Sequence, residues 1–331
     1  MGAVGVIARR WSAVGSRASA ASAASAALLL GALLAACAGG DDADQGDGGD
    51  GSDGVEVRCP LVRGCPDWLE AYEREVIGTL SGERPIDGDV SLSERFSEDE
   101  RAMTRAYISD QLAGFGLEPR LDEYPGGANV IAELAGTGED DALVVVGAHL
   151  DTVRVAPGAA DDGTGVALVL AAARYLSELE RRDHTVVFAL FDGEEVGFKG
   201  SSAFANELRL DGASVLAMHQ FDMLSWDLDG DRGVELWAPA PALEALYRDA
   251  ADEVGVPVAS FEFYSSDHSS FIGAGFAAIG VGEQYVEGDS TPFYHQPSDT
   301  YDKIDFDYVT STTVLGLRAL ERQLGASGSA P

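Results

Sequence analysis

The spacing of apolar residues divides the chain after about residue 67 into alternating strands and helices. Short runs of consecutive apolar residues are typical of strands covered on both faces. They predict strands at 129–134, 142–148, 185–191, 214–218 and 277–281. Apolar residues three or four positions apart are typical of amphipathic helices. They predict helices at 67–80, 97–112, 163–182, 201–208, 242–254 and 308–324.

Strands that alternate with helices predict one α/β domain, which we place at residues 67–331. Its expected architecture is a three-layer sandwich, with a mostly parallel central sheet and helices on both faces. Ser97 is expected to cap the second helix, with Glu100 at the position of a capping box. In open sheets of this kind, a ligand site lies outside the carboxyl ends of the strands.

The first 37 residues lack this pattern and predict an export signal. Arg9, Arg10 and Arg17 form a basic start, and an uncharged run rich in Ala, Ser and Leu follows at 18–34. The small residues before Cys37 resemble a bacterial lipobox, which implies a lipid anchor at Cys37 and export to a bacterial cell membrane, on its periplasmic or extracellular face. An ordinary cleaved signal and a transmembrane anchor are the alternatives, and the short Ala/Ser-rich run argues against the latter.

Residues 38–66 predict a flexible acidic tether that ends in a small cysteine loop. The stretch 39–54 is dominated by Asp, Gly and Ser and has no apolar residue other than Ala, so it cannot form a core. Cys59 and Cys65 are close in sequence, and in an exported chain they predict a disulfide. Two free thiols are the alternative.

Composition narrows the classes of partner. The net charge is −34, with 22 basic residues against 56 acidic ones, so the chain lacks the basic patch that a nucleic-acid binder needs. We therefore expect no nucleic-acid partner, and we interpret the acidity as a solubility feature. With 46% apolar residues, 331 residues suffice for one large core or two small ones.

Candidate metal ligands follow three of the predicted strands. His149 and Asp151 follow the strand at 142–148, and Glu194 and Glu195 follow the strand at 185–191. Asp222 follows the strand at 214–218. Three strands would thus deliver imidazole and carboxylate groups to one edge of the sheet, and open catalytic zinc sites use these ligand types.

Each candidate also has an ordinary structural interpretation. His149-x-Asp151 is weak evidence taken alone, and Asp162 could serve only as a helix cap. That role leaves the adjacent Asp161 unexplained, and Asp161 is a natural bridging carboxylate.

The remaining candidates have ordinary interpretations too. Glu194-Glu195 could be a solvated acidic turn, and His295 could be an isolated loop histidine. If His295 does bind metal, Asp299 is expected to be its supporting partner. The weight of each candidate comes from the others.

The order and spacing of these residues resemble the di-zinc exopeptidase family of the secreted bacterial leucyl aminopeptidases, peptidase family M28. The motifs are His-x-Asp, Asp-Asp-x-Ser/Thr-Gly, Glu-Glu, Asp and His, and the match covers roughly residues 129–304. The resemblance implies two Zn²⁺ ions held by five residues: His149 and Asp222 on one ion, Glu195 and His295 on the other, and Asp161 between them, joined to Asp162 by a cis peptide bond.

The same resemblance implies the catalytic roles. Glu194 would be the general base, Asp151 would orient the ring of His149, and Tyr294 would steady the oxyanion. His268, in a segment that also resembles the family, is expected to be structural or to line the pocket rather than to bind metal.

The implied activity is that of an aminopeptidase that removes N-terminal residues from peptide substrates. Cousins of the deacylase and carboxypeptidase type usually carry a lid domain before the last His, and the 72 residues between Asp222 and His295 leave no room for it. A carboxypeptidase or dipeptidase of the same family stays an alternative, because specificity depends on the shape of the pocket. A glutaminyl cyclase would have Ser and Trp where this chain has Asp162 and Tyr294. A non-catalytic receptor-like scaffold is the third alternative, in a fold whose members can lose their ligands.

Overall fold

The computed structural model describes residues 65–326 of the 331-residue chain. The predicted signal at 1–37, with Cys37, and almost all of the predicted tether lie outside the described residues. Cys65 is disulfide-bonded, whereas its predicted partner Cys59 is outside that range. Within residues 65–326, no helix is both long enough and apolar enough to cross a membrane.

Within the described residues, eight strands form a single sheet. They are β1 (Arg120–Tyr124), β2 (Gly127–Leu134), β3 (Leu143–His149), β4 (Thr185–Phe191), β5 (Val215–Phe221), β6 (Val234–Trp237), β7 (Val258–Phe261) and β8 (Ala278–Gly282). Their order in space is β1-β2-β4-β3-β5-β8-β6-β7. The neighbours β4, β3, β5 and β8 are parallel, as are β6 and β7, and the remaining pairs are antiparallel. The sheet is therefore parallel at its centre, as predicted.

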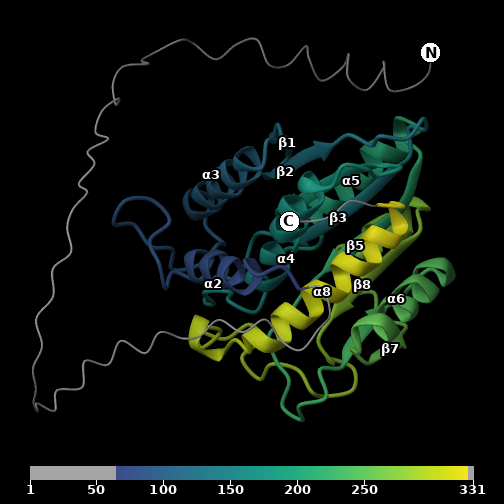
Figure 1. The fold of residues 1–331 in the computed structure, drawn as a ribbon. Coiled ribbons are helices and arrows are strands. Elements are labelled where there is room, and N and C mark those ends of the chain that lie inside the picture. The colour runs from purple at the N-terminus through teal and green to yellow at the C-terminus, as the bar shows by residue number, and fades with distance from the viewer. Residues whose placement is uncertain (1–64, 327–331) are drawn as a thin grey trace, which may run out of the picture. The chain divides into compact units, whose positions relative to one another are not determined.

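Helices cover both faces of this sheet, which confirms the expected α/β sandwich (Figure 1). The helices are α2 (Leu69–Leu80), α3 (Glu98–Gly114), α4 (Gly163–Glu178), α5 (Lys199–Leu210), α6 (Pro241–Val254), α7 (His268–Ala274) and α8 (Phe306–Gln323), with a short 3₁₀ helix at Tyr301–Lys303. The larger core joins the sheet to α2, α3, α4, α6 and α8. The smaller core joins the opposite face to α5 and α7.

The two cores explain the continuous apolar runs of the central strands. In β3, Val144 and Val146 belong to the larger core, whereas Val145 between them belongs to the smaller one. Successive side chains of a strand point to opposite faces. A strand between two helical layers must therefore be apolar at every position.

The structure departs from the predicted elements in a few places. The capping box is wrong: the side chain of Ser97 makes no cap hydrogen bond, although Ser97 does occupy the N-cap position. Glu100 instead accepts hydrogen bonds from the backbone N–H groups of Ser93 and Glu94. Helix α4 ends at Glu178 rather than near residue 182. The short elements β1, β6, β7 and α7 have too few residues to show a period.

Candidate metal centre

Side chains from three neighbouring parallel strands meet at the carboxyl edge of the sheet. His149 is the last residue of β3, Asp222 comes directly after β5, and Glu194 and Glu195 lie in the turn after β4. Because these strands are parallel and adjacent, their ends lie side by side. The sequence-predicted candidates are therefore brought together rather than scattered.

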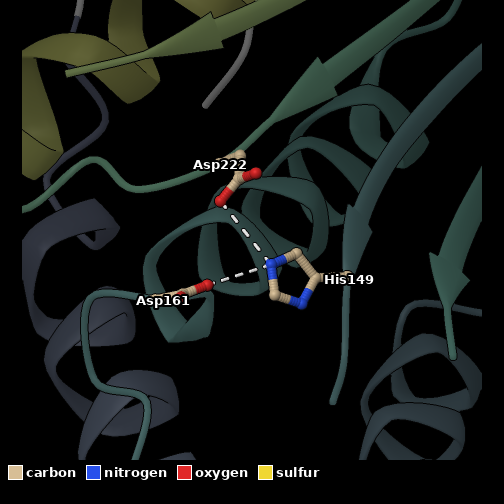
Figure 2. A group of neighbouring side chains, drawn as sticks. All are labelled: His149, Asp161 and Asp222. Atoms are coloured by element: carbon tan, nitrogen blue, oxygen red, sulfur yellow. Dashed lines mark ion pairs between the residues drawn. The ribbon is translucent and has the colours of Figure 1, made fainter. Parts of the chain in front are cut away.

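The first group of candidate ligands is His149, Asp161 and Asp222 (Figure 2). Nε2 of His149 lies 3.1 Å from Oδ1 of Asp161 and 3.6 Å from Oδ1 of Asp222. All three side chains are buried. They come from three separate segments, so only the folded sheet edge creates the group.

The second group consists of Asp161, Glu195 and His295. Nε2 of His295 lies 3.0 Å from Oε2 of Glu195 and 3.3 Å from Oδ2 of Asp161. The two oxygens of Asp161 therefore face different imidazoles, one in each group. This is the arrangement that a bridging carboxylate between two cations needs.

Two buried carboxylate oxygens in these groups have no hydrogen-bond partner among the described residues: Oδ1 of Asp222 and Oε1 of Glu195. A buried charged oxygen without a partner is costly, because it has lost its water. Both oxygens belong to candidate ligand residues. Carboxylate oxygens and imidazole nitrogens are also the donors that Zn²⁺ accepts, so this donor set fits a bound cation.

The carboxylates around the two groups raise the pKa of both imidazoles, His149 and His295. Burial disfavours a charged ring at His149, but the carboxylates around it, Glu194 foremost, raise its pKa well above the usual value. Hydrogen bonds to Asp161 and Glu195 raise the pKa of His295 to about 10. The carboxylates thus draw positive charge onto both rings, which is the behaviour expected of a cation site.

Asp151 supports the centre in two ways. Its backbone carbonyl accepts from Nδ1 of His149 at 3.1 Å, whereas its carboxylate is 3.7 Å from the same nitrogen. The carboxylate instead accepts the backbone N–H groups of Glu194 and Glu195, at 3.1 and 3.3 Å. The expected partnership with His149 is therefore made through the main chain, and the side chain fixes the Glu-Glu turn.

Asp222 is held by residues that the sequence did not single out. The hydroxyl of Ser266 donates to Oδ2 of Asp222 at 2.7 Å, and Nε2 of Gln220 donates to the same oxygen at 3.2 Å. His268 contacts Oε1 of Gln220 and the carbonyl of Phe263. As expected, it belongs to neither group of candidate metal ligands.

Asp299 fixes the backbone at Asp161 by hydrogen bonds. The Asp299 carboxylate accepts the backbone N–H groups of Ala160 and Asp161, at 2.8 and 3.2 Å. The expectation that Asp299 supports His295 is therefore wrong, since no hydrogen bond among the described residues joins the two. Asp162 caps α4 by accepting from the N–H of Gly165, and the Asp161–Asp162 peptide bond is cis.

A cavity of about 250 Å³ opens beside the two groups. Its lining combines candidate ligands with aromatic and apolar side chains: His149, Asp161, Glu194, Asp222, Met223, Trp237, Phe263, Ser265, Tyr285, Tyr294 and His295. No lysine or arginine is among them. Trp237, Phe263 and Tyr285 were missed at the sequence level, because an aromatic residue in a short strand or loop carries no chemical signal of its own.

Glu194 and Tyr294 lie in this cavity close to the candidate ligands. Within residues 65–326, no hydrogen bond or ion pair engages the carboxylate of Glu194. Burial, followed by the charges of Asp267 and Asp222, raises the pKa of Glu194 well above its usual value, against an opposing effect of His149. Burial and the same acidic surroundings raise the pKa of Tyr294, so its phenol stays protonated.

Comparison with known proteins identifies the family. The family model described as "Peptidase family M28" matches residues 129–317, which is more than half of the chain. The chain therefore belongs to peptidase family M28. This confirms the resemblance that rested on the order and spacing of the motifs.

Curated relatives match the same part of the chain. A Trichophyton verrucosum protein named "Probable leucine aminopeptidase" is 30% identical over 207 residues, covering 57% of this chain and 55% of that protein. A Mycobacterium tuberculosis protein named "Probable lipoprotein aminopeptidase LpqL" is 31% identical over 208 residues, covering 54% of this chain and 41% of that protein. The chain spans about half the length of the curated relatives it matches.

Solved structures share the fold. The LapA aminopeptidase of Legionella pneumophila superposes with a TM-score of 0.67 at 20% identity, covering 77% of this chain and 74% of that one. The glutaminyl cyclase of Porphyromonas gingivalis does so with a TM-score of 0.61 at 20% identity, covering 77% and 98%. At such identities the likeness shows the fold alone, so it does not distinguish a peptidase from a cyclase.

Proposed function

We propose that this protein is a zinc-dependent aminopeptidase. The observation that carries the proposal is the carboxylate of Asp161, whose two oxygens face His149 and His295. Beside it lie two further carboxylates, each with a buried oxygen that has no hydrogen-bond partner among the described residues. Membership of a peptidase family and the adjacent cavity support it.

The five candidate ligands divide between two ions. His149 and Asp222 would hold one, Glu195 and His295 the other, and Asp161 would bridge them. Zinc bound there would polarise a peptide carbonyl and lower the pKa of a bound water. The count of two ions is part of the proposal.

Glu194 is the proposed general base. Its carboxylate would take a proton from the attacking water and deliver it to the nitrogen of the leaving amine. Burial raises the pKa of Glu194, which strengthens it as a proton acceptor. The protonated phenol of Tyr294 would donate a hydrogen bond to the developing oxyanion.

The lining of the cavity favours attack at the N-terminus of the substrate. A C-terminal carboxylate would need a cationic side chain, and the lining contains no lysine or arginine. An aminopeptidase therefore fits this cavity better than a carboxypeptidase.

The test is the Glu194→Gln variant, assayed on leucine p-nitroanilide. We expect wild-type protein to carry about two zinc ions per chain by plasma emission spectroscopy. The variant should keep both ions yet lose hydrolysis by several orders of magnitude. The exposed Glu139→Gln variant, the same change away from the site, should match wild type.

Other results would point elsewhere. Full activity in the Glu194→Gln variant would remove Glu194 from the mechanism. One zinc ion per chain would favour a glutaminyl cyclase, and none would favour a non-catalytic scaffold.

We further propose that the protein is an exported lipoprotein whose catalytic domain, residues 67–331, is joined to a lipid at Cys37 by the acidic tether. The Ala-rich run that ends at Cys37 supports this, and so does the relative named as a lipoprotein aminopeptidase. Peptides at the outer face of a bacterial membrane would then be its substrates.

A further inference from the structure

The cavity beside the metal centre has one wall made of aromatic rings in continuous contact. Ring centroids lie 4.9 Å apart for Trp237 and Phe263, 5.5 Å for Phe263 and Tyr285, and 6.1 Å for Tyr285 and Tyr294. Tyr294 then stacks on His295 at 3.7 Å. An apolar substrate side chain in the cavity would therefore rest on rings whose positions depend on one another.

One buried carboxylate fixes this wall at two points. Oε2 of Glu235 accepts the indole N–H of Trp237 at 2.8 Å. Oε1 accepts the backbone N–H groups of Val286 and Glu287, both at 2.8 Å, directly after Tyr285. Glu235 is fully buried and is not part of the cavity lining.

Two glycines of β8, Gly280 and Gly282, leave room for the indole ring of Trp237. Trp237 lies opposite Gly280, and Glu235 opposite Gly282, in the antiparallel pairing of β6 with β8. A Cβ atom at Gly282 would fall 2.1 Å from the Trp237 ring, and one at Gly280 would fall 3.0 Å from it. The indole therefore packs against the backbone of these two glycines, and its N–H group is fixed by the hydrogen bond to Glu235.

We propose that Glu235 is a positioning residue that sets the side-chain selectivity of the site. It would hold Trp237 and the segment after Tyr285 at the spacing that a large apolar N-terminal side chain fills, leucine or phenylalanine rather than alanine. This inference rests on the proposed aminopeptidase function and adds a determinant of selectivity that touches neither metal nor substrate.

Glu235→Gln is the sharpest variant, because the shape of the side chain is kept. Its amide oxygen can still accept the two backbone N–H groups, but its NH₂ group would then face the indole N–H, donor against donor. In Trp237→Phe the ring face remains and the indole donor is gone. The cost of Glu235→Gln should therefore be smaller in the Trp237→Phe background than in wild type.

The full-length variants are assayed on leucine, phenylalanine and alanine p-nitroanilides. For Glu235→Gln we expect the leucine-over-alanine ratio of kcat/KM to fall about five- to tenfold, mainly through KM, with zinc content unchanged. The matched control is Glu73→Gln, because Glu73 is also a fully buried carboxylate bound to two donors, the hydroxyls of Thr310 and Thr313. Its ratio should equal that of wild type.

A second readout does not need turnover. Free L-leucine should raise the Tm of wild type more than L-alanine does, and Glu235→Gln should lose most of that difference. The inference is overturned if Glu235→Gln slows all three substrates equally, or if the leucine and alanine shifts keep their difference. Absence of turnover in wild type would count against the proposed function alone, since the Tm shifts would still decide the role of Glu235.

Discussion

At the scale of single residues, each carboxylate of the candidate centre has its two oxygens in different surroundings. In Asp222, Oδ2 accepts hydrogen bonds from Ser266 and Gln220, whereas Oδ1 has no hydrogen-bond partner among residues 65–326. In Glu195, Oε2 faces His295, whereas Oε1 has no hydrogen-bond partner in that range. The supporting hydrogen bonds therefore determine which oxygen is available to a cation. Residues that never touch the cation can control how well it is held.

Asp151→Asn tests this control. In wild type, each oxygen of Asp151 accepts one backbone N–H group, from Glu194 and from Glu195. Asparagine has only one oxygen, so its NH₂ group would face one of these N–H groups, donor against donor. The turn that carries both glutamates should therefore shift. We expect activity or zinc affinity to fall about 10- to 100-fold, measured by kcat/KM and by zinc titration against a chelator. Asp140→Asn, in the exposed pair with His184, makes the same change at the surface and should leave kcat/KM and zinc affinity unchanged. An unchanged Asp151→Asn enzyme would show that the turn holds without this carboxylate.

The residues that could be predicted from the sequence share one property: together they form an ordered set of possible metal ligands. His149, Asp161 and His295 were found because imidazole and paired acids occur there in a specific order. Ser266 and Trp237 could not be found, since serine and tryptophan have many structural roles. Only the folded chain shows that the first supports Asp222 and the second lines the cavity.

At the scale of elements, the strands with continuous apolar runs were predicted, including the five-residue β8, whereas the short strands β1, β6 and β7 were not. The seven residues of β4 are apolar almost throughout because both faces are covered, and such a run is visible in a sequence. Strands β6 and β7 have four residues each, too few for a period to emerge. These short strands nevertheless lead to Trp237 and Phe263, so the walls of the cavity were harder to predict than its candidate ligands.

The contact between α2 and α8 contains a buried acid that makes stability depend on pH. Burial raises the pKa of Glu73 to about 8, although the hydroxyls of Thr310 and Thr313 oppose the shift, and its ordinary value is 4.5. Between those two pH values the folded protein keeps a proton that the unfolded chain releases. The contribution of Glu73 to the free energy of unfolding is therefore fully present below pH 4.5 and is lost progressively as pH rises to about 8.

Glu73→Gln should remove this dependence. The amide is neutral at every pH and can still bond to both hydroxyls, so we expect the variant to be more stable than wild type at pH 9 and comparable at pH 5. The gain should be on the order of a few kcal/mol at most. Urea denaturation of both proteins at pH 5, 7 and 9 measures the difference. Parallel curves for the two proteins would mean that Glu73 does not titrate in this window.

At the scale of the whole molecule, the net charge of −34 and the proposed lipid anchor would have opposite effects on the distance between the protein and a membrane. A strongly acidic domain is repelled by anionic lipid headgroups. An acidic tether and a covalent lipid would then keep the enzyme near a membrane without letting it adsorb to the surface.

Cys37→Ser tests the anchor. Without the thiol no lipid can be attached, so nearly all of the protein expressed in a bacterial host should move from the detergent phase to the aqueous phase on phase separation. Cys59→Ser, which alters a different cysteine, should stay in the detergent phase. Retention of the Cys37→Ser protein with the membrane would contradict the anchor.

The position of β8 has a consequence for the order in which the candidate site is assembled. Strands β6 and β7 are synthesised before β8, yet they join the rest of the sheet only through it, because β8 lies between β5 and β6. Trp237 and Phe263 on that outer part therefore reach the cavity only after residues 278–282 are in place, and His295 follows later still. The candidate metal centre and its cavity would thus stay incomplete in a growing chain until residues 278–295 had been synthesised.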